Sequence, residues 1–255
     1  MPRFRLLIEY AGTRYSGWQI QKNARTVQGE IDRAIRDTLR PREFELYGSG
    51  RTDAGVHAVG QVAHLEIYTT LKPEQLRRTI NDELPSDIHL IAVDKAPHKF
   101  HARHDAVARS YVYQISRRRT AFGKPFVWWI KEPLDLAAMR EAAALFVGRQ
   151  DFRGFTDDDP AEKSTVVHVE TLELVDAGSL ILIRIQGSHF LWKMVRRIVG
   201  VLAAVGRGEL SPREAVKSGL DVAALTAPSA GLFLERVYYD AADGPGELRP
   251  LINVG

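Results

Sequence analysis

The order of predicted strands and helices limits the fold of this chain more than any other feature, because the same order occurs twice. In the first half, alternating apolar residues predict strands, and apolar residues three or four positions apart predict helices. The order is strand, helix, strand, strand, helix, strand. The predicted strands are 4–10, 44–47, 61–67 and 88–93, and the predicted helices are 27–38, capped by Thr26, and 73–83.

The second half repeats this order if one short helix, from Ser211 to Ser218, is left aside. We therefore expect an α+β fold of two tandem ferredoxin-like βαββαβ halves, residues 1–105 and 106–255, which form a mixed, mainly antiparallel sheet with a central cleft. The Gly- and Pro-rich residues after Tyr239 are expected to be loosely ordered. The predicted strands of this half are 111–116, 166–175, 180–185 and 232–238, and the helices are 136–147, capped by Asp135, and 190–205.

Composition excludes several classes of protein. The chain has 0 cysteines, which excludes disulfides, thiolate zinc sites and cysteine nucleophiles. No apolar run approaches the roughly 18 residues of a membrane span, and the first residues lack the apolar core of a signal peptide. We therefore expect a cytoplasmic protein without a membrane partner.

Positive charge is concentrated in short arginine runs. The net charge is only +3, but 26 of the 35 basic residues are Arg, and runs occur at 77–78, 117–119 and 196–197. A planar guanidinium can bind a phosphate through two hydrogen bonds, so such runs are typical of an RNA-binding surface. A solvated face gives the same pattern, and the runs alone do not decide between the two.

The loop from Gly48 to His57, between two predicted strands, holds the residues best suited to chemistry. Its glycines permit positive φ and close backbone approach. Arg51 and Asp53 are two positions apart and are expected to project to one side, where a guanidinium can keep a carboxylate ionised. The alternative is an Asp that only braces its turn. The loop is neither a P-loop, since Gly-Lys-Ser/Thr is missing, nor a dinucleotide fingerprint, since a strand follows it, and no nucleotide cofactor is expected.

The ten residues of this loop resemble the signature of the tRNA pseudouridine synthase A family. The resemblance extends from Phe4 to about Tyr239, with no departure at a catalytic position. It implies the pseudouridine synthase fold, whose central cleft holds the active site. It also implies an isomerase that converts uridine to pseudouridine at positions 38, 39 and 40 in the anticodon stem-loop of tRNA. The other matching segments are 10–19, 100–103, 108–113, 190–200 and 227–232.

The resemblance also assigns roles to individual residues. Asp53 is implied as the catalytic residue and Arg196 as its charge partner. Tyr111 is expected to stack on the flipped uracil, Arg51 to displace or hold the target nucleotide, and Leu232 to line the base pocket. The candidates for further RNA contacts are His101 and Arg103, from the matching central segment, and Lys193 and Arg197, from a basic helix turn.

Two motifs invite a metal hypothesis that we do not favour. His98, His101 and His104 recur every third residue, but an extended linker with this spacing does not converge on one ion. The run from Asp157 to Asp159 precedes Pro160 and is interpreted as a solvated turn. Because the isomerisation involves no redox change, we expect neither a cofactor nor a metal.

Two other functions compete with the enzymatic one. A non-catalytic RNA-binding module with ferredoxin-like halves is the main alternative, although we find no aromatic RNA-binding signature of the usual kind. A glycosidase-like hydrolase needs a second carboxylate, and no acidic residue in a comparable motif accompanies Asp53. The family resemblance further implies a homodimer with tRNA as its partner.

Overall fold

The computed structural model describes residues 1–217 and 219–254, which form two compact units. The first unit comprises Met1–Val107 and Phe233–Asp243, and the second comprises Ala108–Leu232 and Gly244–Gly255. The last strand, expected in the second half, therefore belongs with the first unit. The proposal that residues 1–105 and 106–255 are the two domains stays a prediction.

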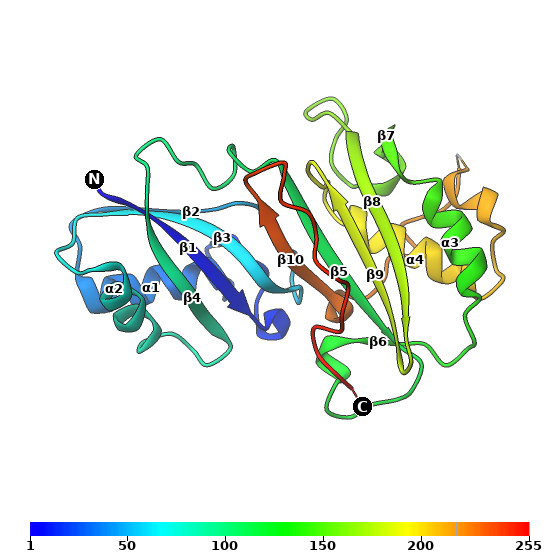
Figure 1. Cartoon of the computed structure of the whole chain (residues 1–255), viewed down its shortest axis with the longest axis horizontal. Helices are drawn as coiled ribbons and strands as arrows, with labels where there is room; N and C mark the ends of the chain where they lie inside the picture. The colour runs from blue at the N-terminus through cyan, green and yellow to red at the C-terminus, as the bar shows by residue number, and fades with distance from the viewer. Residues whose placement is uncertain (218, 255) are drawn as a thin grey trace. The chain divides into compact units, whose positions relative to one another are not determined.

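The first unit contains the strand and helix order expected from its sequence (Figure 1). Its sheet has the order β4-β1-β3-β10, and β2 pairs with β3 as well. All of these pairs are antiparallel except that of β3 with β10. The elements are β1 (Arg3–Tyr10), α1 (Val27–Leu39), β2 (Phe44–Gly48), β3 (His57–Ile67), α2 (Pro73–Asn81), β4 (Ile88–Ala96) and β10 (Leu232–Tyr238).

The second unit has a sheet of order β5-β9-β8-β7, all antiparallel, with β6 parallel to β5. Strands β6 and β7 are additions to the predicted set. The elements are β5 (Ala108–Ser116), β6 (Trp128–Trp129), α3 (Leu136–Ala144), β7 (Gly148–Asp151), β8 (Val166–Ala177), β9 (Leu180–Gly187) and α4 (Met194–Gly206). The 3-10 helices of the chain are η1 (Gly12–Arg14), η2 (Lys124–Phe126), η3 (Arg153–Phe155), η4 (Pro212–Val216) and η5 (Ser229–Gly231).

Two predicted helices differ from the observed ones. The helix predicted from residue 190 begins at Met194, because Lys193 has a left-handed backbone with φ of 60° that a helix cannot include. The helix predicted from Ser211 is the short η4, and its predicted end at Ser218 lies outside the described residues. Two of the helix caps predicted from sequence, Thr26 and Asp135, are confirmed: Thr26 accepts a hydrogen bond from the backbone N–H of Gly29, and Asp135 accepts from the first turn of α3.

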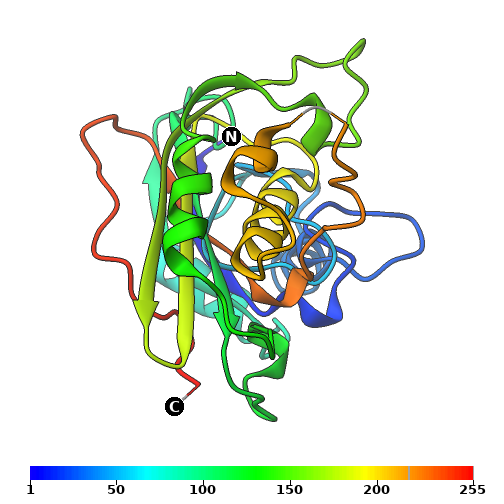
Figure 2. The same ribbon diagram turned by 90° about the vertical axis from the view of Figure 1, so that its right-hand side faces the viewer.

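The C-terminal segment of the second unit packs on its sheet, which corrects the expectation of a loosely ordered tail. Leu248 and Val254 are buried in one cluster with Val112 and Leu182. The β5 side chain of Gln114 accepts a hydrogen bond from the Leu251 backbone at 2.8 Å. Figure 2 shows this segment on one side of the sheet of the second unit and α4 on the other. Every residue of β9 is buried as a result.

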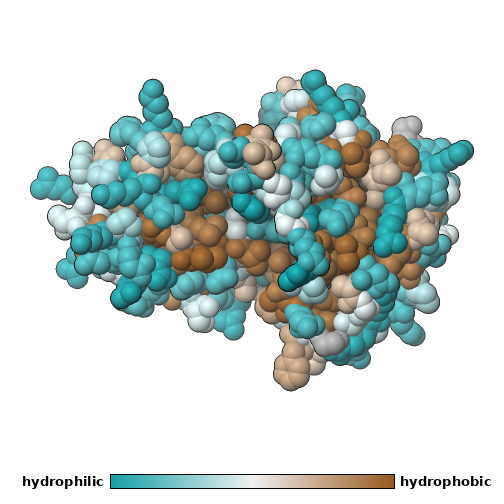
Figure 3. Space-filling model, in the orientation of Figure 1, coloured by the Kyte–Doolittle hydropathy of each residue, from teal (hydrophilic) through white to brown (hydrophobic). Residues whose placement is uncertain are grey.

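The sheet of the first unit is covered less evenly by the rest of the chain than the sheet of the second unit. Helix α2 packs on β4, and α1 packs on β2 and on α2. Leu7 of β1 is only half-buried and Ile91 of β4 is 38% exposed. In the space-filling view, hydrophobic side chains gather over these two strands, with hydrophilic ones around them (Figure 3). Within residues 1–217 and 219–254, no helix combines the length and the apolar character that crossing a membrane requires.

Candidate active site

The loop from Gly48 to His57 connects β2 to β3, and its stem is fixed by hydrogen bonds to β3. The backbone N–H of Ser49 donates to the carbonyl of Val62 at 2.7 Å, and the Ser49 hydroxyl donates to Gln61 Oε1 at 2.7 Å. The Gln61 amide in turn donates to the carbonyl of Gly50 at 3.1 Å. Since Gln61 is fully buried, the loop leaves the sheet from a rigid base.

The segment that follows β1 holds the loop from its other side. The Trp18 backbone N–H donates to the carbonyl of Thr52 at 3.1 Å, and the Thr52 hydroxyl lies 2.8 Å from the hydroxyl of Tyr10. Thr52 and Tyr10 are both buried. The residue directly before Asp53 is thus fixed through both its backbone and its side chain.

Two glycines permit this close contact. Gly17 has φ of +95°, and a Cβ there would lie 2.5 Å from the carbonyl oxygen of Thr52. A Cβ on Gly48 would lie 2.5 Å from the indole nitrogen of Trp18. The segment 10–19 and the loop therefore pack as one unit that tolerates no larger residue at these points.

His57 anchors the end of the loop in the core. Its side chain is 1% exposed and stacks on Phe233 of β10, with the ring centroids 4.7 Å apart. Its Nδ1 accepts a hydrogen bond from the backbone N–H of Gly12 at 3.0 Å, so this nitrogen carries no proton. These contacts let His57 hold the end of the loop against the core.

Asp53 itself is half-buried and Arg51 is exposed. The carbonyl of Asp53 closes a turn by accepting from the N–H of Val56 at 3.1 Å, next to Gly55 with φ of 79°. Beside the loop lies a small depression, which Arg51 lines together with Arg103. The structure thus brings together two cations that the sequence places far apart.

The linker that carries Arg103 is organised around His101. The backbone N–H groups of Arg103 and His104 both donate to His101 Nδ1 at 3.2 Å, and Asp105 accepts from the His101 N–H. The His101 ring lies 5.1 Å from the ring of Tyr47 and 4.8 Å from that of His64. The linker is therefore folded and not extended, but the described residues contain no group of three acidic or His side chains able to hold a metal.

His64, beneath this linker, has a perturbed proton affinity. It is 1% exposed, and its Nδ1 accepts from the backbone N–H of Ala102 at 3.2 Å. Burial, with help from Arg3 and His101, lowers the pKa of His64 from 6.5 to about 4. The imidazole is neutral near pH 7, which keeps the linker docked on β3.

The second unit carries Tyr111, Arg196 and Leu232. Tyr111, on β5, is half-buried and packs edge-on against Phe190 at 5.2 Å. Arg196, on α4, is also half-buried, and its Nε donates to the carbonyl of Ala227 at 2.7 Å. Leu232, at the start of β10, is 4% exposed. The expected pairing of Arg196 with Asp53 stays a prediction.

The segment before Leu232 is itself closely packed. The hydroxyl of Tyr113 donates to the carbonyl of Pro228 at 2.7 Å, and a Cβ on Gly231 would lie 2.6 Å from the Tyr113 ring. Tyr113 is fully buried, whereas Tyr111, two residues earlier in β5, is not. Sequence reasoning missed Tyr113, as it missed Tyr10 and Thr52, because each acts through a contact distant in the sequence.

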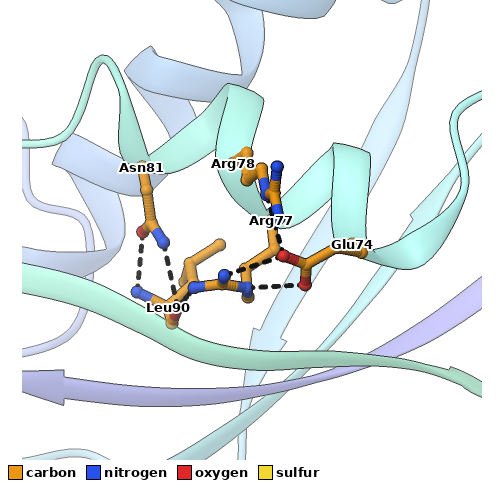
Figure 4. Close-up of polar contacts among 5 residues, drawn as sticks. All are labelled: Glu74, Arg77, Arg78, Asn81 and Leu90. Atoms are coloured by element: carbon orange, nitrogen blue, oxygen red, sulfur yellow. Dashed lines mark hydrogen bonds and ion pairs between the residues drawn. The ribbon is translucent and has the colours of Figure 1, made fainter.

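Part of each arginine run is paired with acids of the same unit. Arg77 and Arg78 on α2 both donate to Glu74, which lowers the pKa of Glu74 to about 2, and Figure 4 shows the two guanidinium groups around this carboxylate. Arg117 forms two hydrogen bonds with Asp176, at 2.6 and 2.9 Å. These runs are therefore less positive than the sequence indicates.

The acidic run at 157–159 is more than the solvated turn that we expected. Asp157 accepts from Lys193 Nζ at 2.8 Å and from Arg197, and these cations, in that order, lower its pKa. Asp158 accepts from Lys163 Nζ at 2.8 Å and from the Trp192 N–H at 3.1 Å. The two cations proposed as RNA contacts near α4 are thus occupied by a carboxylate of their own unit.

The family model and the relatives that match this chain all carry the name tRNA pseudouridine synthase. A family model described as tRNA pseudouridine synthase matches residues 6–105 and 142–240, and the first stretch contains the whole loop from Gly48 to His57. The matching relatives named tRNA pseudouridine synthase A include three that align over nearly their whole length. That of Thermodesulfovibrio yellowstonii is 37% identical over 255 residues, 94% of this chain and 100% of that protein. That of Pseudothermotoga lettingae is 38% identical, over 93% and 99% of the two chains, and that of Citrifermentans bemidjiense is 40% identical, over 94% and 98%.

Proposed function

Because this chain belongs to the tRNA pseudouridine synthase family, we propose that it converts uridine to pseudouridine at positions 38, 39 and 40 in the anticodon stem-loop of tRNA, with Asp53 as the catalytic residue. One observation carries the role of Asp53. The loop around it is held by β3 on one side and by the segment 10–19 on the other, which fixes the backbone directly before the carboxylate. A preorganised carboxylate is what a positioned nucleophile or base requires.

The reaction needs little beyond such a carboxylate. The N1–C1′ bond of uridine breaks, the uracil rotates, and a bond forms between C1′ and C5. The hydrogen on C5 then leaves as a proton to solvent, and N1 takes up a proton. The product is therefore an isomer of the substrate, and no oxidant and no activated nucleotide are consumed. One ionised side chain, acting as a nucleophile or as a base, is sufficient for the protein's part in this chemistry.

The target base must leave its stack before Asp53 can reach it, at a cost of a few kcal/mol. We propose that Arg51, exposed at the edge of the loop, holds or displaces the nucleotide, and that Tyr111 stacks on the flipped uracil. Leu232 is proposed to line the base pocket and Arg196 to pair with the carboxylate. Arg103 lines the same depression as Arg51, which supports the proposal that it contacts RNA, with His101 beside it.

We extend the proposal to a homodimer that acts in the cytoplasm, as the family resemblance implies. Light scattering of the purified protein tests the first part. A molar mass near twice 28.6 kDa is expected, and the mass of a single chain would contradict it.

Asp53→Asn tests the catalytic assignment, since it keeps the shape of the side chain and removes its charge. Release of tritium from C5-labelled uridine in tRNA should fall below detection, because even about 5 kcal/mol of lost transition-state stabilisation lowers the rate by nearly four decades. Affinity for tRNA and melting temperature should be retained, because most affinity comes from phosphate contacts. Asp37→Asn, an exposed position on α1, is the matched control and should change none of the three.

The pattern of losses separates the alternatives. Joint loss of release, affinity and melting temperature in Asp53→Asn would favour an Asp that only braces its turn. Binding of tRNA without tritium release by the unaltered protein would favour the non-catalytic RNA-binding module.

A further inference from the structure

The N-terminal end of α4 forms a basic corner that a loop of the same unit covers. Lys193 and Arg197 both donate to Asp157, in the loop between η3 and β8. Asp158 of the same loop accepts from the backbone N–H of Trp192 at 3.1 Å. Arg197 is almost fully buried, with a side chain only 4% exposed, while Asp157 is 37% exposed. The loop that carries Asp157 thus lies between the Arg197 guanidinium and the solvent.

The carboxylate does not satisfy this guanidinium. Where Arg36 meets Asp32 and Arg207 meets Glu209, the neighbouring Nε and NH2 donors of the arginine are both used. Arg197 donates to one oxygen of Asp157 through NH2 alone, and Lys193 donates to the other oxygen. Across residues 1–217 and 219–254, Arg197 Nε finds no acceptor although it is buried. A buried donor without a partner is costly, and here it belongs to the same guanidinium that donates to Asp157.

The helix end adds further positive potential. No acidic residue lies in the first turn of α4, and no side chain caps it within the described part of the chain. The free N–H groups of a helix N-terminus attract anions. Lys193 and Arg197 therefore share the Asp157 carboxylate, while Asp158, which meets the backbone next to the helix end, is itself paired with Lys163.

We propose that this corner binds a phosphodiester of the tRNA backbone and that the Asp157 loop occupies it in the free protein. The inference rests on the proposed function, since it identifies tRNA as the source of the phosphate. A phosphodiester carries two charged oxygens and two ester oxygens in a tetrahedral arrangement. It can accept from both Nε and NH2 of Arg197 and still accept from Lys193, which the carboxylate does not achieve. Bound RNA therefore replaces Asp157 and moves the loop outward.

The first test removes the competing charge. Asp157→Asn should bind tRNA about fivefold more tightly, the change that corresponds to one surface ion pair at the upper end of its usual strength. Asp159→Asn, an exposed neighbour with no ion pair in the described part of the chain, should bind as the unaltered protein does. Unchanged or weaker binding by Asp157→Asn, with a lowered melting temperature, would mean that Asp157 only braces the fold and would overturn the proposal.

The second test locks the loop in place and does not depend on removing Asp157. Because the chain has 0 cysteines, Asp158→Cys with Trp192→Cys introduces one pair of thiols, at two positions already in contact. The oxidised, cross-linked protein should bind tRNA at least about tenfold more weakly than the same protein after reduction, as expected if the charge-assisted hydrogen bonds of one phosphodiester to Arg197 and Lys193 are lost. Equal affinity of the two forms would show that the loop need not move and would overturn the proposal.

These tests fail separately from the proposed function. Tritium release by the unaltered protein reports the isomerase reaction whatever the loop does. Tritium release by the unaltered protein, together with equal tRNA affinity of the oxidised and reduced cross-linking variant, would refute only the role of the loop. Absence of release would refute the proposed function, and the affinity measurements would still report whether RNA displaces Asp157.

Discussion

Replacing Gly17 by Ala tests whether the segment 10–19 positions the catalytic loop. Gly17 has φ of +95°, and the new Cβ would lie 2.5 Å from the carbonyl oxygen of Thr52. The nearest atoms are backbone atoms, so no flexible side chain can move aside. The same carbonyl accepts the hydrogen bond from Trp18 at 3.1 Å. The substitution therefore pushes the chain directly before Asp53 away from its support.

The expected loss of stability follows from two contributions. An L-residue at a left-handed backbone position costs roughly 1–2 kcal/mol. Lengthening or losing the bond between Trp18 and Thr52 costs about 1 kcal/mol more. We expect the free energy of unfolding to fall by about 2–3 kcal/mol. The rate should fall further than stability alone explains, because misplacing a reacting group by about 1 Å costs on the order of 10²-fold.

The assay compares pseudouridine yield at limiting time with the urea midpoint, in Gly17→Ala and two controls. Gly178→Ala, in the turn between β8 and β9, has φ of +72° and open space around the new Cβ, so it shares the backbone cost without the collision. Gly50→Ala, inside the loop, meets nothing within 4 Å. Both control variants should give the same yield of pseudouridine as the unaltered protein. If Gly17→Ala matched Gly178→Ala in yield as well as in stability, the segment would not position Asp53 and the reasoning would fail.

Two further outcomes are expected. The pKa of His64 is about 4 in the folded protein and 6.5 ordinarily, so the unfolded state binds the proton first as the pH falls. The stability that neutral His64 contributes is complete above pH 6.5 and is lost towards pH 4, by up to about 3 kcal/mol, and the melting temperature should fall accordingly. His64→Gln should flatten this fall, and parallel pH curves for the two proteins would rule out His64 as the cause. Leu248→Ala should lower the free energy of unfolding by about 2 kcal/mol because it empties a buried position under the C-terminal segment. The exposed Glu247→Ala should not, and equal urea midpoints for the two variants would mean that the segment is not docked.

Features that depend on neighbours in the sequence were predictable. The caps Thr26 and Asp135 act within three residues of themselves, and their side chains accept the predicted hydrogen bonds. The turn chemistry of the loop at 48–57 is likewise local, since its glycines and its Asp lie side by side in the sequence. The order of strands and helices in the first unit follows from periodicity that each element carries by itself.

Features that depend on distant partners were not predictable. Phe190 to Lys193 continue the apolar spacing of α4, and only the left-handed backbone of Lys193 excludes them from the helix. The pairing of β10 with β3 joins residues 57–58 to 233–234, and no local signal distinguishes it from pairing within the second half. The residues after Tyr239 are rich in Gly and Pro, but hydrophobic residues of β5 and β9 supply the surface against which Leu248 and Val254 are buried.

Charge is the property for which the sequence is most misleading. A run such as Arg77-Arg78 counts as two cations, but one carboxylate on the same helix lies between them. Arg51 is part of no run, yet it is exposed and lines one depression with Arg103. Bound RNA is attracted by the electrostatic potential that remains at the protein surface once cations are paired with acids of the same protein. This potential depends on which acids the fold brings to each cation. By this measure the corner at α4, where Lys193 and Arg197 share Asp157 and the described residues offer Arg197 Nε no acceptor, is a stronger candidate for a phosphate contact than Arg117, which is already paired with Asp176.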